Sequence, residues 1–253
     1  MMARPILVAN WKNHPSSLIE AKTLLRQLSR SSKLYKKLFF FIAPPYPYFA
    51  LVSERLGNFG QLAAQDVFVL PSGNHTGQVT LDILKSFGVR LAILGHSERR
   101  ALGETNDSVS QKINIALRSG IIPLVCVGET ARDQDGEHFE FLRDELKLSL
   151  AGLNRKNDIA KLVIAYEPVW AIGKNARDAI APADLSQSVI FIRKVLTDMF
   201  GRKTAEHIPI LYGGSVESAN VRALLHETGI RGFLVGHASL HTKSLEAIAE
   251  SLI

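Results

Sequence analysis

Short apolar runs alternate with longer amphipathic segments from one end of this 253-residue chain to the other. An apolar run of about four to eight residues is typical of a buried strand, whereas a longer segment with apolar residues at every third or fourth position is typical of a helix. Strict alternation of the two predicts parallel strands joined by right-handed helical crossovers. The sequence contains eight such units, which is the number that closes a parallel sheet into a barrel.

The predicted strands are Ile6 to Ala9, Leu38 to Ala43, Gln61 to Ala64, Leu91 to Leu94, Ile122 to Val127, Leu162 to Tyr166, Ile208 to Leu211 and Gly232 to Val235. The predicted helices are Ser16 to Leu28, Tyr48 to Leu56, Val79 to Phe87, Asp107 to Arg118, Glu137 to Leu150, Ala183 to Phe200, Val216 to His226 and Lys243 to Leu252. We therefore predict an α/β fold, a barrel of eight parallel strands inside eight helices. No Ser-, Gly- or Pro-rich linker divides residues 1–253, so we expect a single domain. An open doubly wound sheet is the alternative, and the lack of a Gly-rich phosphate-binding fingerprint after the first strand disfavours it.

Several functional classes are disfavoured by composition and motifs. The sequence has neither GxGxxG nor GxxxxGK[ST], so it carries no dinucleotide or nucleoside triphosphate fingerprint. The eight His residues are scattered without metal-ligand spacing, and we expect no metal and no cofactor. No apolar run approaches a membrane span, and the N-terminus does not resemble a signal peptide. Cys126 is the only cysteine, so we expect a buried, reduced thiol in a cytoplasmic protein.

The formal net charge of +6 raises the question of a nucleic-acid partner. The densest basic cluster is formed by Arg26, Arg30, Lys33, Lys36 and Lys37, near the end of the first predicted helix. Positive charge at that position also complements the helix C-terminus, and no nucleic-acid-binding motif accompanies it. We expect a solvated basic face and no nucleic-acid binding, with modest steering of anionic substrates.

The segment LVIAYEPVWAIGK, residues 162–174, combines features of an active-site loop. Its apolar start predicts a strand buried on both faces, and Glu167 comes where that strand ends. Pro168 cannot extend the ladder of backbone hydrogen bonds, and Gly173 permits backbone conformations that other residues resist. This pattern is typical of a catalytic base beneath a closing loop, although a solvated Glu in an ordinary turn fits the segment taken alone.

Other strand ends carry residues of the same kind. Because catalytic groups of such barrels gather in the loops that follow the strands, these residues are expected to lie on one rim. The candidates are Asn10 and Lys12 after the first strand, His96 and Glu98 after the fourth, Glu167 after the sixth, Gly213 to Ser215 after the seventh and Gly236 to Ala238 after the eighth.

Seven short motifs resemble the triosephosphate isomerase family in order and over the full length of the chain. They are NWK, AAQDV, GHSERR, CVGE, YEPVWAIG, YGGSV and VGHASL. The resemblance implies a TIM barrel and an aldose-ketose isomerase that interconverts dihydroxyacetone phosphate and glyceraldehyde 3-phosphate without a cofactor. It also implies a cytoplasmic homodimer of glycolysis and gluconeogenesis, in which Thr76 reaches the active site of the neighbouring subunit.

The resemblance also implies a role for individual residues. Asn10 and Lys12 correspond to substrate contacts, His96 to the electrophile, Glu167 to the base and Glu98 to the partner that positions Lys12. A carboxylate can move the proton between neighbouring carbons through an enediolate, while fixed donors and positive charge stabilise the developing oxyanion. The phosphate-binding positions implied are Asn10, Lys12, Gly173, Ser215, Gly236 and His237.

The chain departs from the family pattern at several places. Between Gly173 and Pro182 it reads KNARDAIA, about two residues longer than is usual for the closing loop and without a second Gly. Lys174 and Arg177 are candidates for electrostatic compensation there. Gln78 stands where the family commonly has Glu, which removes an expected partner of Arg99 across the dimer interface.

Two rival functions stay open on the sequence alone. One is another phosphosugar isomerase barrel, which does not account for Asn10, Lys12 and His96. The other is a noncatalytic barrel retained as a binding or scaffold protein, which the altered closing loop favours and the intact candidate residues disfavour.

Overall fold

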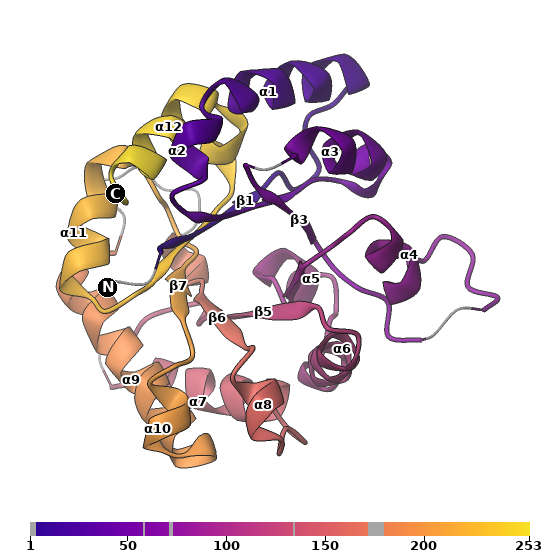
Figure 1. The fold of residues 1–253 in the computed structure, drawn as a ribbon. Coiled ribbons are helices and arrows are strands. Elements are labelled where there is room, and N and C mark those ends of the chain that lie inside the picture. The colour runs from indigo at the N-terminus through magenta and orange to yellow at the C-terminus, as the bar shows by residue number, and fades with distance from the viewer. Residues whose placement is uncertain (1–3, 58, 71–72, 134, 172–179) are drawn as a thin grey trace.

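The eight predicted strands form a closed parallel barrel (Figure 1). The structure is a computed structural model that describes residues 4–57, 59–70, 73–133, 135–171 and 180–253. Each strand pairs with the next in the sequence, and the last pairs with the first. The strands are β1 Ile6–Asn10, β2 Phe39–Ala43, β3 Gln61–Ala64, β4 Leu91–Leu94, β5 Ile122–Val127, β6 Val163–Tyr166, β7 Ile210–Tyr212 and β8 Gly232–Val235. The predicted (β/α)8 TIM barrel is therefore confirmed.

A ring of helices surrounds the barrel, as Figure 1 shows. The longer ones are α1 Leu18–Arg30, α3 Phe49–Leu56, α4 Leu81–Ser86, α6 Asn106–Arg118, α7 Glu137–Ser149, α9 Pro182–Phe200, α11 Ser218–Glu227 and α12 Thr242–Glu250. All eight predicted helices are present, with ends that differ by a few residues. The helix predicted from Val216 begins at Ser218, because Glu217 and Asn220 form a capping box that ends the preceding loop.

Short helices that the sequence pattern did not predict lie between these elements. They are α2 Ser32–Tyr35, α5 Ser97–Ala101, α8 Lys156–Ile159 and α10 Arg202–Ala205, with the 3₁₀ turns η1 Tyr46–Tyr48, η2 Val169–Ala171 and η4 His237–Leu240. Single helical turns contain too few residues to show a helical period. Of these elements, α5 matters most for the site, because it begins directly after His96.

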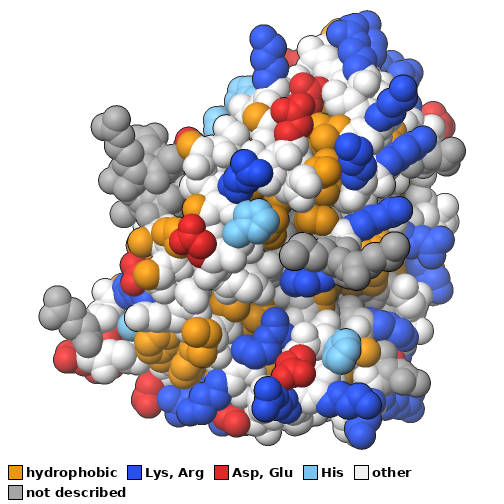
Figure 2. Space-filling view, turned by 60° about the vertical axis from the view of Figure 1, so that its left-hand side comes forward, with side chains coloured by type: hydrophobic (Ala, Val, Ile, Leu, Met, Phe, Trp, Pro, Cys, Tyr) orange, Lys and Arg blue, Asp and Glu red, His pale blue; other side chains and the backbone are white. Residues whose placement is uncertain are grey.

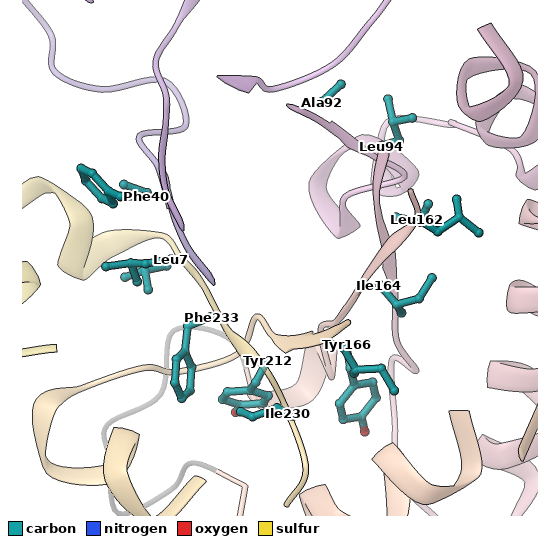
Figure 3. Packing of buried hydrophobic residues seen from close by; sticks show 14 of the residues in the cluster. Leu7, Phe40, Ala92, Leu94, Leu162, Ile164, Tyr166, Tyr212, Ile230 and Phe233 are labelled. Atoms are coloured by element: carbon teal, nitrogen blue, oxygen red, sulfur yellow. The ribbon is translucent and has the colours of Figure 1, made fainter. Parts of the chain in front are cut away.

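The strand residues alternate between two hydrophobic layers. Leu7 and Ala9 belong to the large layer between barrel and helices, whereas Val8 belongs to a smaller cluster that fills the barrel interior. Figure 3 shows part of the outer layer, where the rings of Tyr212 and Phe233 meet nearly edge to face with centroids 6.5 Å apart. This two-residue alternation decides which strand-end residues point into the barrel mouth.

The surface is rich in basic side chains. On the face seen in Figure 2, Lys and Arg outnumber acidic residues and gather toward the right and lower edges. None of the helices in the described ranges combines the length and the apolar character that a membrane crossing requires. Within the same ranges, no group of three or more His, Cys, Asp or Glu residues is arranged to hold a metal ion. Cys126 is free and buried, and burial raises the pKa of its thiol well above the usual value.

Barrel closure depends on a glycine where the first and last strands meet. Gly232 pairs with Ile6, and its φ of 151° lies in a region that other residues rarely adopt. A Cβ atom at Gly232 would lie 1.8 Å from the carbonyl oxygen of Ile6. The closing pair of strands therefore has no room for a side chain at this position.

We predict that Gly232→Ala lowers the free energy of unfolding by on the order of 3 kcal/mol or more, because it combines a backbone clash with strain. Gly120→Ala is the matched control: Gly120 has a φ of 76°, but nothing lies within 4 Å of a Cβ there. The control should lose only about 1–2 kcal/mol, the cost of the left-handed conformation alone. Chemical denaturation of both variants measures the difference, and equal losses would contradict the steric argument.

Candidate active site

The predicted strand-end residues other than Glu98 line one cavity at the mouth of the barrel, and Glu98 lines a neighbouring one. The volume of the first cavity is about 530 Å³. The side chains of Asn10 and Glu167 point into the barrel because of the alternation described above. Asn10 continues the inward-facing positions of β1, and Glu167 continues the inward-facing positions of β6. The lining residues include Asn10, Lys12, His96, Glu167, Gly213, Gly214, Ser215, Gly236 and His237.

Glu167 is held on a rigid part of the barrel. Its carboxylate is buried, with the residue only 2% exposed. The N–H of Glu167 donates to the carbonyl of Val127 at 2.8 Å, and the N–H of Val169 donates to the carbonyl of Glu129 at 2.9 Å. Pro168 lies between these two hydrogen bonds and ends the strand. The position of the carboxylate is thus set by the neighbouring strand β5.

His96 faces Glu167 across the cavity. Its Nε2 lies 3.3 Å from Oε1 of Glu167, and both residues are buried. The N–H of Glu98 donates to Nδ1 of His96 at 3.2 Å, so Nδ1 is an acceptor and carries no proton. A neutral imidazole therefore has its proton on Nε2, where it can donate to a substrate oxygen. The N–H of Ser97 also points to Glu167, at 3.4 Å from Oε2.

Lys12 brings positive charge to the same rim. Its backbone has a φ of 52°, which is unusual for a residue with a side chain. The Oδ1 atom of Asn10 accepts its N–H at 3.0 Å, and Gln65 donates to its carbonyl at 2.7 Å, so local hydrogen bonds hold this conformation. Its Nζ forms an ion pair with Glu98 at 2.6 Å. The structure thus places Glu98 beside Lys12.

Glycines let the loops after β7 and β8 lie close against Glu167 and Lys12. A Cβ atom at Gly213 would lie 2.6 Å from Cγ of Glu167, and one at Gly236 would lie 3.2 Å from Cε of Lys12. Ser215 is buried, and its hydroxyl donates to the carbonyl of Ala171 at 2.9 Å, which connects the loop after β7 to the start of the closing loop.

The closing loop itself is largely outside the described residues. Residues 172–179 include Gly173, Lys174 and Arg177, so the expectations for these three residues are not addressed by the structure. The segment before them is anchored by Glu129, a residue to which the sequence reasoning gave no role. Its Oε1 accepts hydrogen bonds from the Tyr166 hydroxyl and the Trp170 indole, both at 2.8 Å. The only available signal was its place in the CVGE motif.

Thr76 lies apart from this cavity. It is exposed on the connection between β3 and α4, which projects from the barrel in Figure 1. A second cavity of about 540 Å³ lies between that connection and Lys12. Arg99, for which we expected a missing partner across a dimer interface, pairs within its own chain with Asp66 at 2.8 Å. Arg99 therefore has an ion-pair partner in its own chain, although Gln78 stands where the family commonly has Glu.

We predict that Gly213→Ala slows the triose phosphate isomerisation implied by the resemblance by on the order of a hundredfold, because the new methyl group displaces the Glu167 carboxylate by about an ångström. Gly213 does not have a positive φ, so the effect is steric rather than conformational. Steady-state kinetics test this, with Gly120→Ala, at the opposite end of the barrel, as the control. A Gly213→Ala protein with unchanged kcat would show that the carboxylate does not need this position.

The comparison with known proteins agrees with the geometry. A family model described as triosephosphate isomerase matches residues 5–252. The triosephosphate isomerase of Geobacter metallireducens is 40% identical over 250 residues, which cover 98% of both chains. Those of Carboxydothermus hydrogenoformans and Moorella thermoacetica are 38% identical over 255 residues and 40% identical over 253 residues, covering 100% and 98% of both chains. This chain belongs to the triosephosphate isomerase family.

Proposed function

We propose that Glu167 and His96 interconvert dihydroxyacetone phosphate and D-glyceraldehyde 3-phosphate through an enediolate in this cavity. The interconversion itself follows from membership of the family. The assignment of residues rests on one observation above all: Oε1 of Glu167 and Nε2 of His96 face each other at 3.3 Å beside Lys12, on the wall of a single cavity.

The proton transfers follow from these positions. The Glu167 carboxylate takes a proton from the carbon next to the substrate carbonyl, and the electron pair of that C–H bond forms the enediolate. The proton of the former hydroxyl oxygen moves to the former carbonyl oxygen by way of Nε2 of His96. The protonated carboxyl group returns its own proton to the neighbouring carbon, which completes the isomerisation. Substrate and product have the same oxidation state overall, so the reaction as proposed needs no redox cofactor.

His96 and Lys12 stabilise the negative charge that develops on oxygen. The Nε2–H of His96 donates to the substrate oxygen, while the Lys12 ammonium adds fixed positive charge. Both are held before substrate arrives, His96 by the N–H of Glu98 and Lys12 by the carboxylate of Glu98. Preorganised groups of this kind need no rearrangement during the reaction, which is why they stabilise the transition state effectively.

We place the substrate phosphate between Lys12 and the small-residue loops of Ser215, Gly236 and His237. Backbone N–H groups and a lysine are suited to a dianion. Asn10 completes the substrate contacts, and Gly173 is proposed to join them from the closing loop. A cytoplasmic location is consistent with the buried thiol of Cys126.

We predict that Glu167→Asp lowers kcat by on the order of a hundredfold with a smaller change in KM, because the shorter side chain keeps its charge but withdraws from the carbon atom. A coupled assay with glyceraldehyde 3-phosphate measures both constants. Glu140→Asp, on the exposed surface of α7, is the matched control and should behave as wild type. Wild-type turnover by Glu167→Asp would remove Glu167 from the role of base. Wild-type protein without isomerase activity would instead favour the noncatalytic barrel, and turnover of a larger phosphosugar would favour the other isomerase.

The family resemblance and the exposed position of Thr76 support a homodimer, in which this connection enters the cavity beside Lys12 of the second subunit. Leu102, which lines that cavity, is 81% exposed in the single chain. A side chain of a second subunit that enters this cavity would cover Leu102.

If the dimer completes the site, specific activity and stability should both fall on dilution as subunits separate. Analytical ultracentrifugation at a series of concentrations, paired with activity at the same concentrations, measures this. A monomer that keeps full activity throughout would overturn the proposal.

A further inference from the structure

A buried ion pair outside the substrate cavity joins the two loops that carry His96 and Glu167. It is formed by Arg100 of α5 and Glu145 of α7, with 3.2 Å between Nε and Oε1. The side chain of Glu145 is only 5% exposed and that of Arg100 18%. A cavity of about 510 Å³ lies among these two residues, Gly128 and Glu167. A buried charge is unfavourable unless its surroundings compensate it, so the contacts of this pair call for an explanation.

Arg100 holds the loop that carries His96. Its Nε donates to the carbonyl of Gly95 at 2.7 Å, immediately before His96 in the chain. Its Nη1 donates to Asn106 at 2.7 Å, and its Nη2 donates to Ser149 at 3.1 Å. The guanidinium group therefore ties the start of α5 to α6 and α7. A lysine could not form this set of bonds, because it lacks the planar fork.

Glu145 holds the backbone on which Glu167 rests. Its Oε2 accepts the N–H of Gly128 at 2.8 Å. A Cβ atom at Gly128 would lie 2.1 Å from the carbonyl oxygen of Glu167, so the two backbones are in direct contact. On either side of Gly128, the carbonyls of Val127 and Glu129 bind the Glu167 segment, as described above. Glu145 thus acts on Glu167 through a single peptide unit of β5.

We propose that the Arg100–Glu145 ion pair positions His96 and Glu167 and fixes the distance between them. His96 follows β4 and Glu167 follows β6, and the two side chains face each other at the substrate cavity. The pair supplies a second connection behind them, from Gly95 through Arg100 and Glu145 to Gly128. The proposal rests on the functions proposed above for His96 and Glu167, and neither Arg100 nor Glu145 touches the substrate.

The ionised form of Glu145 is the one that can make both contacts. Its Oε2 accepts the N–H of Gly128, and its Oε1 forms the ion pair with Arg100. The charged groups that face it are Arg100 from α5, Glu129 from the end of β5 and Glu167 from the end of β6. Burial raises the pKa of Glu145 to about 7. Arg100 and the N–H of Gly128 lower this pKa, while the carboxylates of Glu129 and Glu167 raise it further. Below that pH the protonated carboxyl group is neutral, so the ion pair with Arg100 is lost.

The variant Glu145→Gln tests the proposal, since its amide keeps the shape and the bond to Gly128 but presents a donor to Arg100. We expect kcat to fall tenfold or more with KM changed less than about twofold, because a misplaced base slows the chemistry while phosphate contacts are untouched. Inhibition by phosphoglycolate, which extends from the phosphate site toward Glu167, should weaken. Inhibition by inorganic phosphate should not change.

A pH profile adds a readout that a purely structural role would not alter. The ratio of wild-type to Glu145→Gln kcat should be largest well above pH 7 and shrink well below it, because the protonated wild type comes to resemble the variant. Glu140→Gln removes an exposed carboxylate of the same helix and is the matched control, with a ratio near one throughout. Arg100→Lys keeps the charge without the fork and should lower kcat in the same way.

The possible outcomes separate this proposal from the proposed function. Wild-type kcat in folded Glu145→Gln, or equal weakening of phosphoglycolate and phosphate binding, would overturn the positioning role. Wild-type protein without isomerase activity would overturn the function instead. If Glu145→Gln does not fold, Arg100→Lys decides: reduced kcat with unchanged phosphate inhibition supports the proposal, and wild-type kcat overturns it.

Discussion

The backbone contact between β5 and β6 is the constraint on which the site depends. Two hydrogen bonds, from the N–H groups of Glu167 and Val169, fix the end of β6 against its neighbour. Between them Gly128 packs so closely on Glu167 that no side chain fits. The backbone of the barrel therefore fixes where the Glu167 carboxylate lies in the cavity.

Charge is arranged in two layers around this contact. Facing the cavity, Lys12 and His96 lie near Glu167, and Glu98 contacts both: its carboxylate pairs with Lys12 and its backbone N–H donates to His96. Behind it, Arg100 lies among Glu145, Glu129 and Glu167 as a cation within a group of buried acids. Like charges so close together would repel strongly in a medium of low dielectric constant. The internal cation and the backbone donors reduce that repulsion, so the Glu167 carboxylate can be buried without being surrounded by uncompensated charge.

The alternation of inward-facing and outward-facing residues along each strand decides which strand-end side chains enter the mouth of the barrel. Asn10 and Glu167 inherit the inward direction of β1 and β6, so their side chains enter the mouth of the barrel without any special turn. His96 requires one, because Gly95 with a φ of 71° breaks the strand and starts α5. Lys12 requires another, with its own positive φ held by Asn10 and Gln65. Local deviations from regular geometry thus occur where a side chain needs a direction that a strand cannot give.

Sequence alone determined the barrel and most of the residues at its mouth. The spacing of apolar residues and the order of strands and helices along the chain can both be read from the sequence. The strands β3, β4, β5 and β8 have the bounds predicted from the apolar runs. Asn10, Lys12, His96, Glu167, Ser215 and Gly236 meet in one cavity, as expected when the ends of parallel strands converge. The tertiary structure alone decided that Glu129 anchors Trp170, that Arg99 pairs with Asp66, and that Arg100 and Glu145 connect the loops of His96 and Glu167. These contacts join segments far apart in the sequence, and a buried charge on an amphipathic helix carries no local mark of its partner. Their pairing follows from how the helices pack on the barrel, which only the folded chain specifies.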